Sequence, residues 1–249
     1  MQDSILIIQA RLNSTRLPRK ILTEIPQSDG LTLLEFMYSR ITEHIKIPVV
    51  FAIPNAKSDD ELATFLSKKG IEFYRGPEED LISRFIIGAE MYSAETIVRL
   101  TSDCPLVDPF LIEKMLNYFK SKKIDYLGNT TPLDKSTFPD GSDIEIFTKY
   151  ALRKAHYQET EKRNREHVTF QFWEGNHDYS FENFQQEESF SHLRYTIDNV
   201  EDVLVFNRIY NDLIKQSLEF IGFAEIQNFL DKNSNITQIN EKYNPGDNW

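Results

Sequence analysis

Residues 9–20, QARLNSTRLPRK, place three arginines and one lysine within twelve residues of a chain whose formal net charge is -11. Between these cations stand Asn13, Ser14 and Thr15, which are small and polar, and Pro18 stiffens the end of the stretch. Backbone N–H groups and several cations in one loop could surround a polyphosphate. The stretch lacks the glycines of a Walker A loop. A solvated basic connection is the alternative interpretation.

Two carboxylates also follow predicted strands. Asp103 lies in TSDCP, directly after one apolar run, and Asp198 ends the segment LRYTID. A Mg²⁺ ion that is shared with substrate phosphates needs only one or two protein carboxylates, so this pair could hold one ion. Helix capping is the alternative, because Asp198 or Asn199 could cap the helix expected to follow.

The elements that must position these residues alternate in the first half of the chain. Short, β-branched apolar runs bounded by turn residues predict strands, and amphipathic patterns between them predict helices. This order predicts an α/β fold with a mostly parallel mixed sheet and helices on both faces. Strands are expected at 4–9, 49–53, 71–74, 96–100 and 124–127, and helices at about 32–44, 59–69, 78–92 and 109–121.

Helix ends carry local signals. Ser58 and Glu61 have the S-x-x-E spacing of a capping box, and Gly70 stands where a C-terminal cap belongs. Pro109 suits the first position of a helix. These signals support the helices expected at 59–69 and 109–121.

The alternation ends after Leu127. Beyond it we expect a strand at about 143–147, polar helices through 149–173, an irregular segment at 177–193 and a strand at 193–198. Helices at about 200–215 and 223–232 complete the pattern. We therefore expect one domain over residues 1–249, in which 128–193 is an excursion from the sheet.

Ligands of open parallel sheets bind beyond the carboxyl ends of the strands. The basic loop follows the first strand, RGPEEDLISR follows the third, TSDCP follows the fourth and Asp198 ends the late strand. Cations and carboxylates should therefore converge on one edge of the sheet.

Composition limits the class of protein. The 39 acidic residues outnumber the 28 basic ones, which argues against a protein that coats nucleic acid or anionic lipid. No apolar stretch approaches the length of a membrane span, and MQDSILIIQA has too short an aliphatic run for a signal peptide. Cys104 is the one cysteine, which excludes an intramolecular disulfide. We expect a cytoplasmic protein that binds neither nucleic acid nor membrane.

Six segments, in this order and at these separations, resemble the cytidylyltransferases of the spore-coat polysaccharide type. These are relatives of the enzymes that attach CMP to 3-deoxy-manno-octulosonate and to acylneuraminate. The segments are QARLNSTRLPRK, RGPEEDLISRF, RLTSDCPLVDP, FPDGSDIEIF, REHVT and YTIDNVEDV, within about residues 4–215. The resemblance implies a nucleotide-diphospho-sugar transferase fold of the glycosyltransferase-A kind. It further implies transfer of CMP from CTP to a sugar acid or related glycan precursor, with loss of pyrophosphate.

The resemblance also implies roles for single residues. Arg11, Arg16 and Lys20 would contact the triphosphate, and Asp103 and Asp198 would hold Mg²⁺. Relatives usually carry glycine at the places of Asn13 and Arg19, a departure that concerns the backbone and not the cations. The implied nucleotide site comprises Gln9, Ala10, Arg11, Ser14, Arg16, Lys20, Asp80, Arg84 and Thr101.

The residues that would bind the acceptor have weaker signals in the sequence. A sugar hydroxyl or phosphate oxygen would attack the α-phosphorus in line, while Mg²⁺ and the cations neutralise the departing pyrophosphate. His167 could orient or deprotonate the acceptor, or it could be structural. FPDGSDIE reads equally well as a turn into a half-exposed strand. The candidate acceptor residues are Asp140, Asp143, Glu145, Arg165 and His167.

Several residues have plainer explanations. Cys104 is most simply a small buried hydrophobe, and Tyr126, Phe138 and Phe172 are more often core than stacking platforms. FQFW at 170–173 could serve a homodimer interface, as relatives often dimerise through this excursion, or the core.

Two rival functions remain open. A glycosyltransferase of the same fold would place a D-x-D pair after the fourth strand, where this chain has Ser-Asp-Cys. A non-catalytic nucleotide-binding member of the fold is the second rival. The combination of Lys20, Asp103 and Asp198 favours the cytidylyltransferase.

Overall fold

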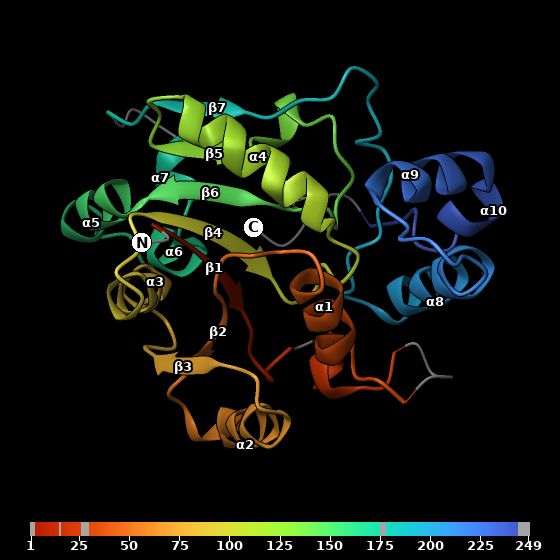
Figure 1. Cartoon of the computed structure of the whole chain (residues 1–249), viewed down its shortest axis with the longest axis horizontal. Coiled ribbons are helices and arrows are strands. Elements are labelled where there is room, and N and C mark those ends of the chain that lie inside the picture. The colour runs from red at the N-terminus through yellow and green to blue at the C-terminus, as the bar shows by residue number, and fades with distance from the viewer. Residues whose placement is uncertain (1–2, 15, 26–29, 175–177, 244–249) are drawn as a thin grey trace.

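The computed structural model describes residues 3–14, 16–25, 30–174 and 178–243. Within these residues seven strands form one sheet in the order β3-β2-β1-β4-β6-β5-β7 (Figure 1). Neighbours are parallel from β3 to β4, β6 is antiparallel to both β4 and β5, and β7 is parallel to β5. The predicted mostly parallel mixed sheet is confirmed. The strands are β1 Ser4–Gln9, β2 Val49–Pro54, β3 Phe73–Gly76, β4 Thr96–Thr101, β5 Tyr126–Gly128, β6 Glu145–Thr148 and β7 Phe181–Asn183.

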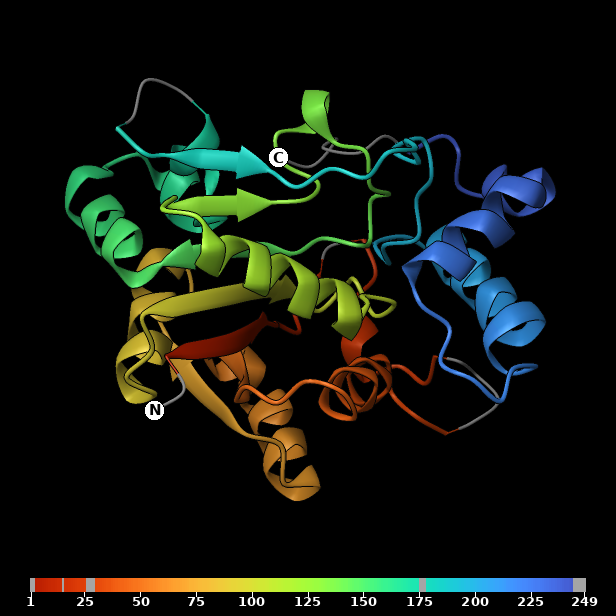
Figure 2. The ribbon, with the colours of Figure 1, turned by 45° about the horizontal axis from the view of Figure 1, so that its top comes forward.

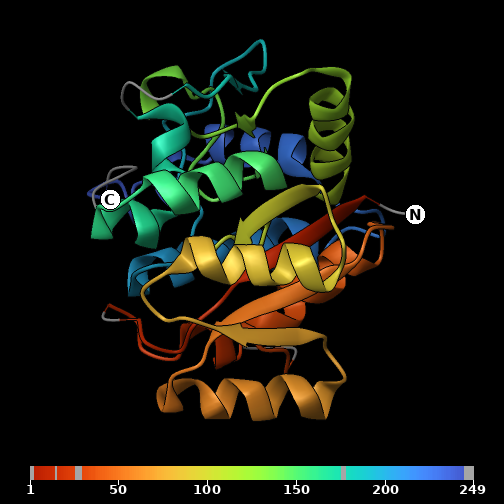
Figure 3. The same ribbon diagram turned by 90° about the vertical axis from the view of Figure 1, so that its left-hand side faces the viewer.

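Helices cover both faces of the sheet, as the alternating pattern predicts (Figures 1 and 3). Successive side chains of β1 point to opposite faces, so Leu6 and Ile8 enter one core while Ile5 and Ile7 enter the other. One face carries α1 Leu33–Thr42, α2 Asp60–Lys69 and α4 Pro109–Ser121, and the other carries α3 Leu81–Met91, α5 Lys149–Gln158 and α7 Phe170–Trp173. Among the described helices, none has both the length and the apolar character needed to cross a membrane.

The C-terminal helices form a third core beyond the ends of the strands. Figure 2 shows α8–α10 on the side toward which the arrowheads of β1 and β4 point. Phe36 of α1 packs edge-on against Phe206 of α8, with ring centroids 5.4 Å apart. These helices are α8 Val200–Ile209, which continues into a π-helical turn at Tyr210–Ile214, α9 Phe223–Lys232 and α10 Ser234–Thr237.

Two expectations about strands after Leu127 are wrong. Residues 193–198 form no strand; apart from one bridge between Asp140 and Arg194, their backbone bonds to loops. The N–H of Ile197 donates to the carbonyl of Asp103 at 2.8 Å. Within 177–193, where we expected irregular structure, β7 instead pairs with β5; residue 177 lies outside the described residues.

Of the predicted helix caps, two are confirmed and one is wrong. Gly70 takes the left-handed conformation, with φ +66°, and ends α2, while Pro109 opens α4, both as predicted. The capping box of Ser58 and Glu61 is wrong, because Asp59 is the N-cap of α2. Glu61 forms an ion pair with Arg19 instead.

Candidate functional site

The basic loop after β1 is folded back on itself. The N–H of Leu12 donates to Asp59 Oδ1 at 2.8 Å, and the carbonyl of Leu12 accepts from the N–H of Arg19 at 3.2 Å. Arg19 has φ +62°, in the left-handed region that glycine adopts most readily. Lys20 follows at once and starts a 3-10 turn, Lys20–Leu22.

Lys20 joins three distant segments of the chain. Its Nζ lies 3.3 Å from Asp103 Oδ2 and 2.9 Å from Asp198 Oδ1, and it donates to the carbonyl of Ile197 at 2.6 Å. The side chain is 9% exposed. Burial would lower the pKa of Lys20, but the two carboxylates raise it above its usual value. The ammonium is therefore a fixed positive charge at the centre of the site.

Asp198 is bound by cations from two sides. Its Oδ1 also accepts from Arg16 at 2.9 Å, and its Oδ2 lies 3.3 Å from Arg194. Burial alone would raise the pKa of Asp198, but Lys20 and Arg16 lower it to about 2. Of the two residues that could cap α8, Asn199 is the N-cap and Asp198 is not, and the N–H groups of both donate to Asp202 Oδ2.

These residues line a cavity of about 400 Å³, which we call the basic cavity. It contains the two expected metal ligands, Asp103 and Asp198, and eight of the nine residues expected at the nucleotide: Gln9, Ala10, Arg11, Ser14, Arg16, Lys20, Arg84 and Thr101. Arg11 is exposed and lies 3.8 Å from Glu166, whereas the guanidinium of Arg84 donates to the carbonyl of Glu78 at 2.8 Å. Arg11 and Arg16 can thus reach a ligand directly, while Arg84 shapes the wall.

The structure does not bring Asp80 or Arg165 to either cavity described here. Asp80 Oδ1 caps α3 by accepting from the N–H of Ser83 at 3.0 Å, and Asp80 forms an ion pair with Arg165. Burial raises the pKa of Asp80, but Arg165 and Ser83 more than offset this and lower it. The pair ties α6, Lys162–His167, to the start of α3.

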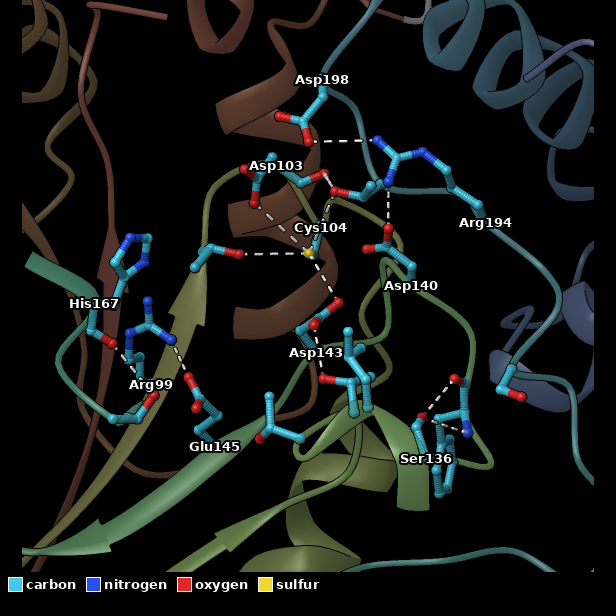
Figure 4. A pocket seen from close by; sticks show the side chains of 18 of the residues that line it. Arg99, Asp103, Cys104, Ser136, Asp140, Asp143, Glu145, His167, Arg194 and Asp198 are labelled. Atoms are coloured by element: carbon cyan, nitrogen blue, oxygen red, sulfur yellow. Dashed lines mark hydrogen bonds and ion pairs between the residues drawn. The ribbon is translucent and has the colours of Figure 1, made fainter. Parts of the chain in front are cut away.

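A second cavity, of about 380 Å³, lies beside the first, and we call it the acidic cavity. Figure 4 shows Asp140, Asp143 and Glu145 on its walls, with Asp103 and Asp198 at one end. The two cavities share Arg99, Thr101, Asp103, His167 and Asp198. A ligand in one cavity therefore meets a ligand in the other at these residues.

Arg99 is a site residue that we did not predict. It extends from β4, forms an ion pair with Glu145 of β6, and donates to Gln9 Oε1 at 3.2 Å. The hydroxyl of Tyr126 donates to the other oxygen of Glu145 at 2.6 Å. The sequence signal for Arg99 is that it places a charge inside the apolar run TIVRL, because a buried charge in a strand needs partners.

Arg194 is the second residue that we missed. Its guanidinium pairs with Asp140, Asp198 and Asp202, and its side chain is 8% exposed. Arg194 thereby holds the end of the 193–198 segment against the acidic cavity. Its position four residues before Asp198 was the available signal.

Asp143 differs from the other carboxylates, because its described partners are not cations. Its Oδ1 accepts from the hydroxyl of Thr130 at 2.7 Å and its Oδ2 from the N–H of Gly141 at 2.8 Å. Cys104 Sγ lies 3.5 Å from Oδ2 and is buried, as predicted. Burial raises the pKa of Asp143. Burial and the neighbouring Asp143 also raise the pKa of Asp140 to about 8, although Arg194 opposes the shift.

His167 lies on the wall shared by the two cavities. Its ring stacks on Phe170, with centroids 4.4 Å apart. Burial lowers the pKa of His167, so a neutral imidazole that can accept a proton is favoured near pH 7. Tyr126, Phe138 and Phe172 are buried in the core, as predicted.

The residues present suit a divalent ion at the meeting point of the cavities. Asp103 and Asp198 both direct a carboxylate oxygen at Lys20 Nζ, so they converge on one position. Among the described residues, no three carboxylate, histidine or cysteine side chains form a complete cage. Two carboxylates that leave the other positions to phosphate and water are the donor set that Mg²⁺ uses.

Comparisons with known proteins identify the family of this chain. The sequence pattern of the cytidylyltransferase family matches residues 5–239. The spore coat polysaccharide biosynthesis protein SpsF of Bacillus subtilis is 31% identical over 215 residues, which cover 84% of this chain and 87% of that protein. A solved cytidylyltransferase from Leptospira borgpetersenii is 32% identical, with a TM-score of 0.85 and coverage of 96% of this chain and 98% of that chain.

A more distant structure shares the fold alone. The synthetase of CMP-2-keto-3-deoxy-manno-octonic acid, solved with CTP, is 14% identical and has a TM-score of 0.57 over 80% of this chain and 94% of that chain. This likeness supports the predicted nucleotide-diphospho-sugar transferase fold. The family match and the more similar relatives confirm a nucleotidyltransferase that depends on CTP, and the chain belongs to the cytidylyltransferase family.

Proposed function

We propose that this enzyme transfers CMP from CTP to a sugar acid or related glycan precursor, releases pyrophosphate and uses Mg²⁺. The observation that carries the proposal is the contact of Lys20 with Asp103 and Asp198 where the two cavities meet. It joins a cation loop suited to a triphosphate with two carboxylates suited to a metal.

In this proposal the triphosphate occupies the basic cavity. Arg11, Arg16 and Lys20 neutralise its negative charge and that of the pyrophosphate that leaves. Asp103 and Asp198 would hold Mg²⁺, which supplies Lewis-acid stabilisation of the phosphate oxygens when bound.

The acceptor occupies the acidic cavity and attacks from there. Its oxygen forms a bond to the α-phosphorus while the bond from that phosphorus to the bridging oxygen breaks, and the electron pair leaves with pyrophosphate. His167, whose lowered pKa keeps it neutral, accepts the proton of the acceptor hydroxyl. Its position on the wall shared by both cavities supports this role.

We also propose that residues 1–249 act as one domain in which 128–193 builds the acceptor side. In support, this segment supplies β6 in the middle of the sheet, as well as Asp140 and Asp143. A cytoplasmic location and a homodimer belong to the same proposal. The burial of Phe170 and Phe172 supports the core alternative for FQFW, and in that case another part of the segment would form the interface. Light scattering measures the oligomeric state.

The decisive experiment measures pyrophosphate release with Mg²⁺ across CTP, UTP, GTP, ATP and dTTP, each with a panel of sugar acids and sugar phosphates. We expect release with CTP and at least one acceptor. Thermal shifts with the same nucleotides measure binding separately, because a ligand that binds only the native state stabilises it. Equal shifts for all five nucleotides would contradict the choice of base while leaving a phosphate site.

A further inference from the structure

The acidic cavity has more carboxylates than free cations. Its walls carry Asp140, Asp143 and Glu145, against which stand Arg99 and Arg194. Both guanidiniums already form ion pairs within the protein. Arg99 pairs with Glu145, and Arg194 pairs with Asp140 and with two further aspartates. One carboxylate, Asp143, forms no ion pair of its own among the described residues, and Arg99, which pairs with Glu145, acts on it only at longer range.

The partners of Asp143 are neutral groups. The Thr130 hydroxyl and the Gly141 N–H each donate one hydrogen bond, and together they hold the carboxylate in one orientation against the wall of the cavity. A carboxylate oxygen can accept more than one hydrogen bond, so each oxygen keeps accepting capacity toward the cavity. The site therefore offers a carboxyl group in one orientation, and its ionised form is costly there unless a cationic group pairs with it.

The remaining polar groups of the cavity suit a polyhydroxylated ligand. Hydroxyls of Thr131, Ser136, Ser191 and Thr196 line it and can both donate and accept, while Phe138 supplies an apolar surface. A free carboxylate of the ligand near Asp143 would face a like charge without a cation that could be released to bind it. A cationic group there would instead form a charge-assisted hydrogen bond.

We propose that the acceptor carries a protonated amine among its hydroxyls, and that Asp143 binds this amine in the acidic cavity. The inference rests on the proposed function, because it is the adjoining basic cavity that makes the acidic one the acceptor side. Asp143 is then a residue that determines acceptor specificity, and the acceptor belongs to the class of amino sugars or amino polyols. A sugar acid fits only if it also bears such an amine.

The test uses three six-carbon probes that differ at one end: sorbitol, 1-amino-1-deoxysorbitol and gluconate. Each is titrated at pH 7 by ligand-observed NMR, with EDTA present and then with Mg²⁺ and the non-hydrolysable α,β-methylene-CTP. We expect the amine to bind about tenfold more tightly than sorbitol, because it gains a charge-assisted hydrogen bond, and we expect gluconate to bind most weakly, because its charge has the same sign as that of Asp143.

Asp143→Asn should abolish the preference for the amine and leave the affinity for sorbitol nearly unchanged. Glu219→Gln, which removes one charge from an exposed residue outside the cavity, is the matched control and should keep the preference. The order of the three probes with the unchanged protein decides the inference even if Asp143→Asn folds poorly. Gluconate that binds as tightly as the amine, or an amine no tighter than sorbitol, would overturn it.

The same titrations separate the inference from the proposed function. Binding of α,β-methylene-CTP without a preference for the amine contradicts the inference alone. A preference for the amine without binding of the CTP analogue contradicts the proposed function and supports the amine site.

Discussion

The basic and acidic cavities share a wall, yet they differ in the kind of residue that charges them. Arg11, Arg16 and Lys20 come from one loop of twelve residues that follows β1. Asp140 and Asp143 come from a turn between β5 and β6, and both have short side chains enclosed in the wall. Long cations from a loop suit an anionic chain of phosphates, whereas short fixed carboxylates suit selection of one small group. The basic and acidic cavities, which lie at one edge of the sheet, thus suit ligand groups of opposite charge.

The comparison also shows why net charge says little about a site. The chain has a formal charge of -11, and one of its two described cavities is nevertheless positive. Local placement after a strand, and not the overall field, concentrates the cations. Asp103 and Asp198 belong to both cavities, so changes to them should have the largest effect.

Asp103→Asn and Asp198→Asn should each lower the rate of pyrophosphate release about a hundredfold or more, a loss comparable to that of a strong electrostatic stabiliser in other enzymes. Because both would hold one ion, the double variant should be little worse than either single one. Initial rates against Mg²⁺ concentration measure this, with melting temperature as the control. Additive losses would show that the two carboxylates serve separate purposes.

Lys20→Met and Arg16→Ala test the basic cavity alone, and we expect losses of roughly tenfold to a hundredfold in kcat/KM for CTP. Lys162→Ala is the matched control, because Lys162 is 72% exposed and pairs only with the equally exposed Glu79. That substitution should change little. Equal losses in all three variants would mean that the loop after β1 acts only through overall charge.

Acid should weaken the part of the fold that Asp198 secures. Its pKa of about 2 lies below the unfolded value of 3.8, so its contribution is present above pH 4 and is lost as the pH falls toward 2. The shift corresponds to about 2 kcal/mol in the free energy of unfolding. Urea unfolding should show the wild type more stable than Asp198→Asn at pH 5, with the difference vanishing near pH 2.

Asp134→Asn, in an exposed turn, serves as the control for this measurement and should run parallel to the wild type. A constant difference between wild type and Asp198→Asn over pH 2 to 5 would show that titration of Asp198 is not its cause.

The smallest effect should appear in metal binding without nucleotide. Lys20 Nζ stands where Asp103 and Asp198 converge, so it competes with a divalent ion for their oxygens. Lys20→Met should therefore bind Mn²⁺ several-fold more tightly than the wild type in the absence of CTP, since a cation between two carboxylates repels another. Isothermal titration or electron paramagnetic resonance gives the affinity, with Lys162→Met as control. Unchanged affinity would place the ion elsewhere.

Strands of the sheet could be predicted where the local sequence pattern alone is sufficient. The runs at 4–9 and 96–101 are apolar, short and bounded, and they became β1 and β4. The 193–198 segment alternates apolar and polar residues as a strand would, yet its backbone partners are Asp103 and Asp140, far away in the sequence. The three residues of β7 form a strand only because β5 offers an open edge. Such choices depend on tertiary partners, which a local pattern does not contain.

The candidate site, like the sheet, could be predicted only in part. Residues directly after strands, such as Lys20 and Asp103, came together because parallel strands end at one edge. Asp80 and Arg165 were expected to face ligands but pair with each other, a contact between helices that no spacing reveals. Arg99 was missed because a residue inside a strand was assumed to be core. Sequence therefore predicted where the chemistry lies better than it predicted how charges pair.

Lys20 also ties the site to the order in which the chain is made. Its carboxylate partner Asp198 lies 178 residues later in the sequence. A ribosome that adds roughly 5 to 20 residues per second needs about 10 to 35 s to cover this distance. During that interval the nascent chain can already hold the apolar strands β1 to β4 and Asp103, while the ammonium still lacks Asp198, the closer of its two carboxylate partners. Closure of the site around Lys20 is thus among the last events of biogenesis, because it waits for the segment that carries Asp198.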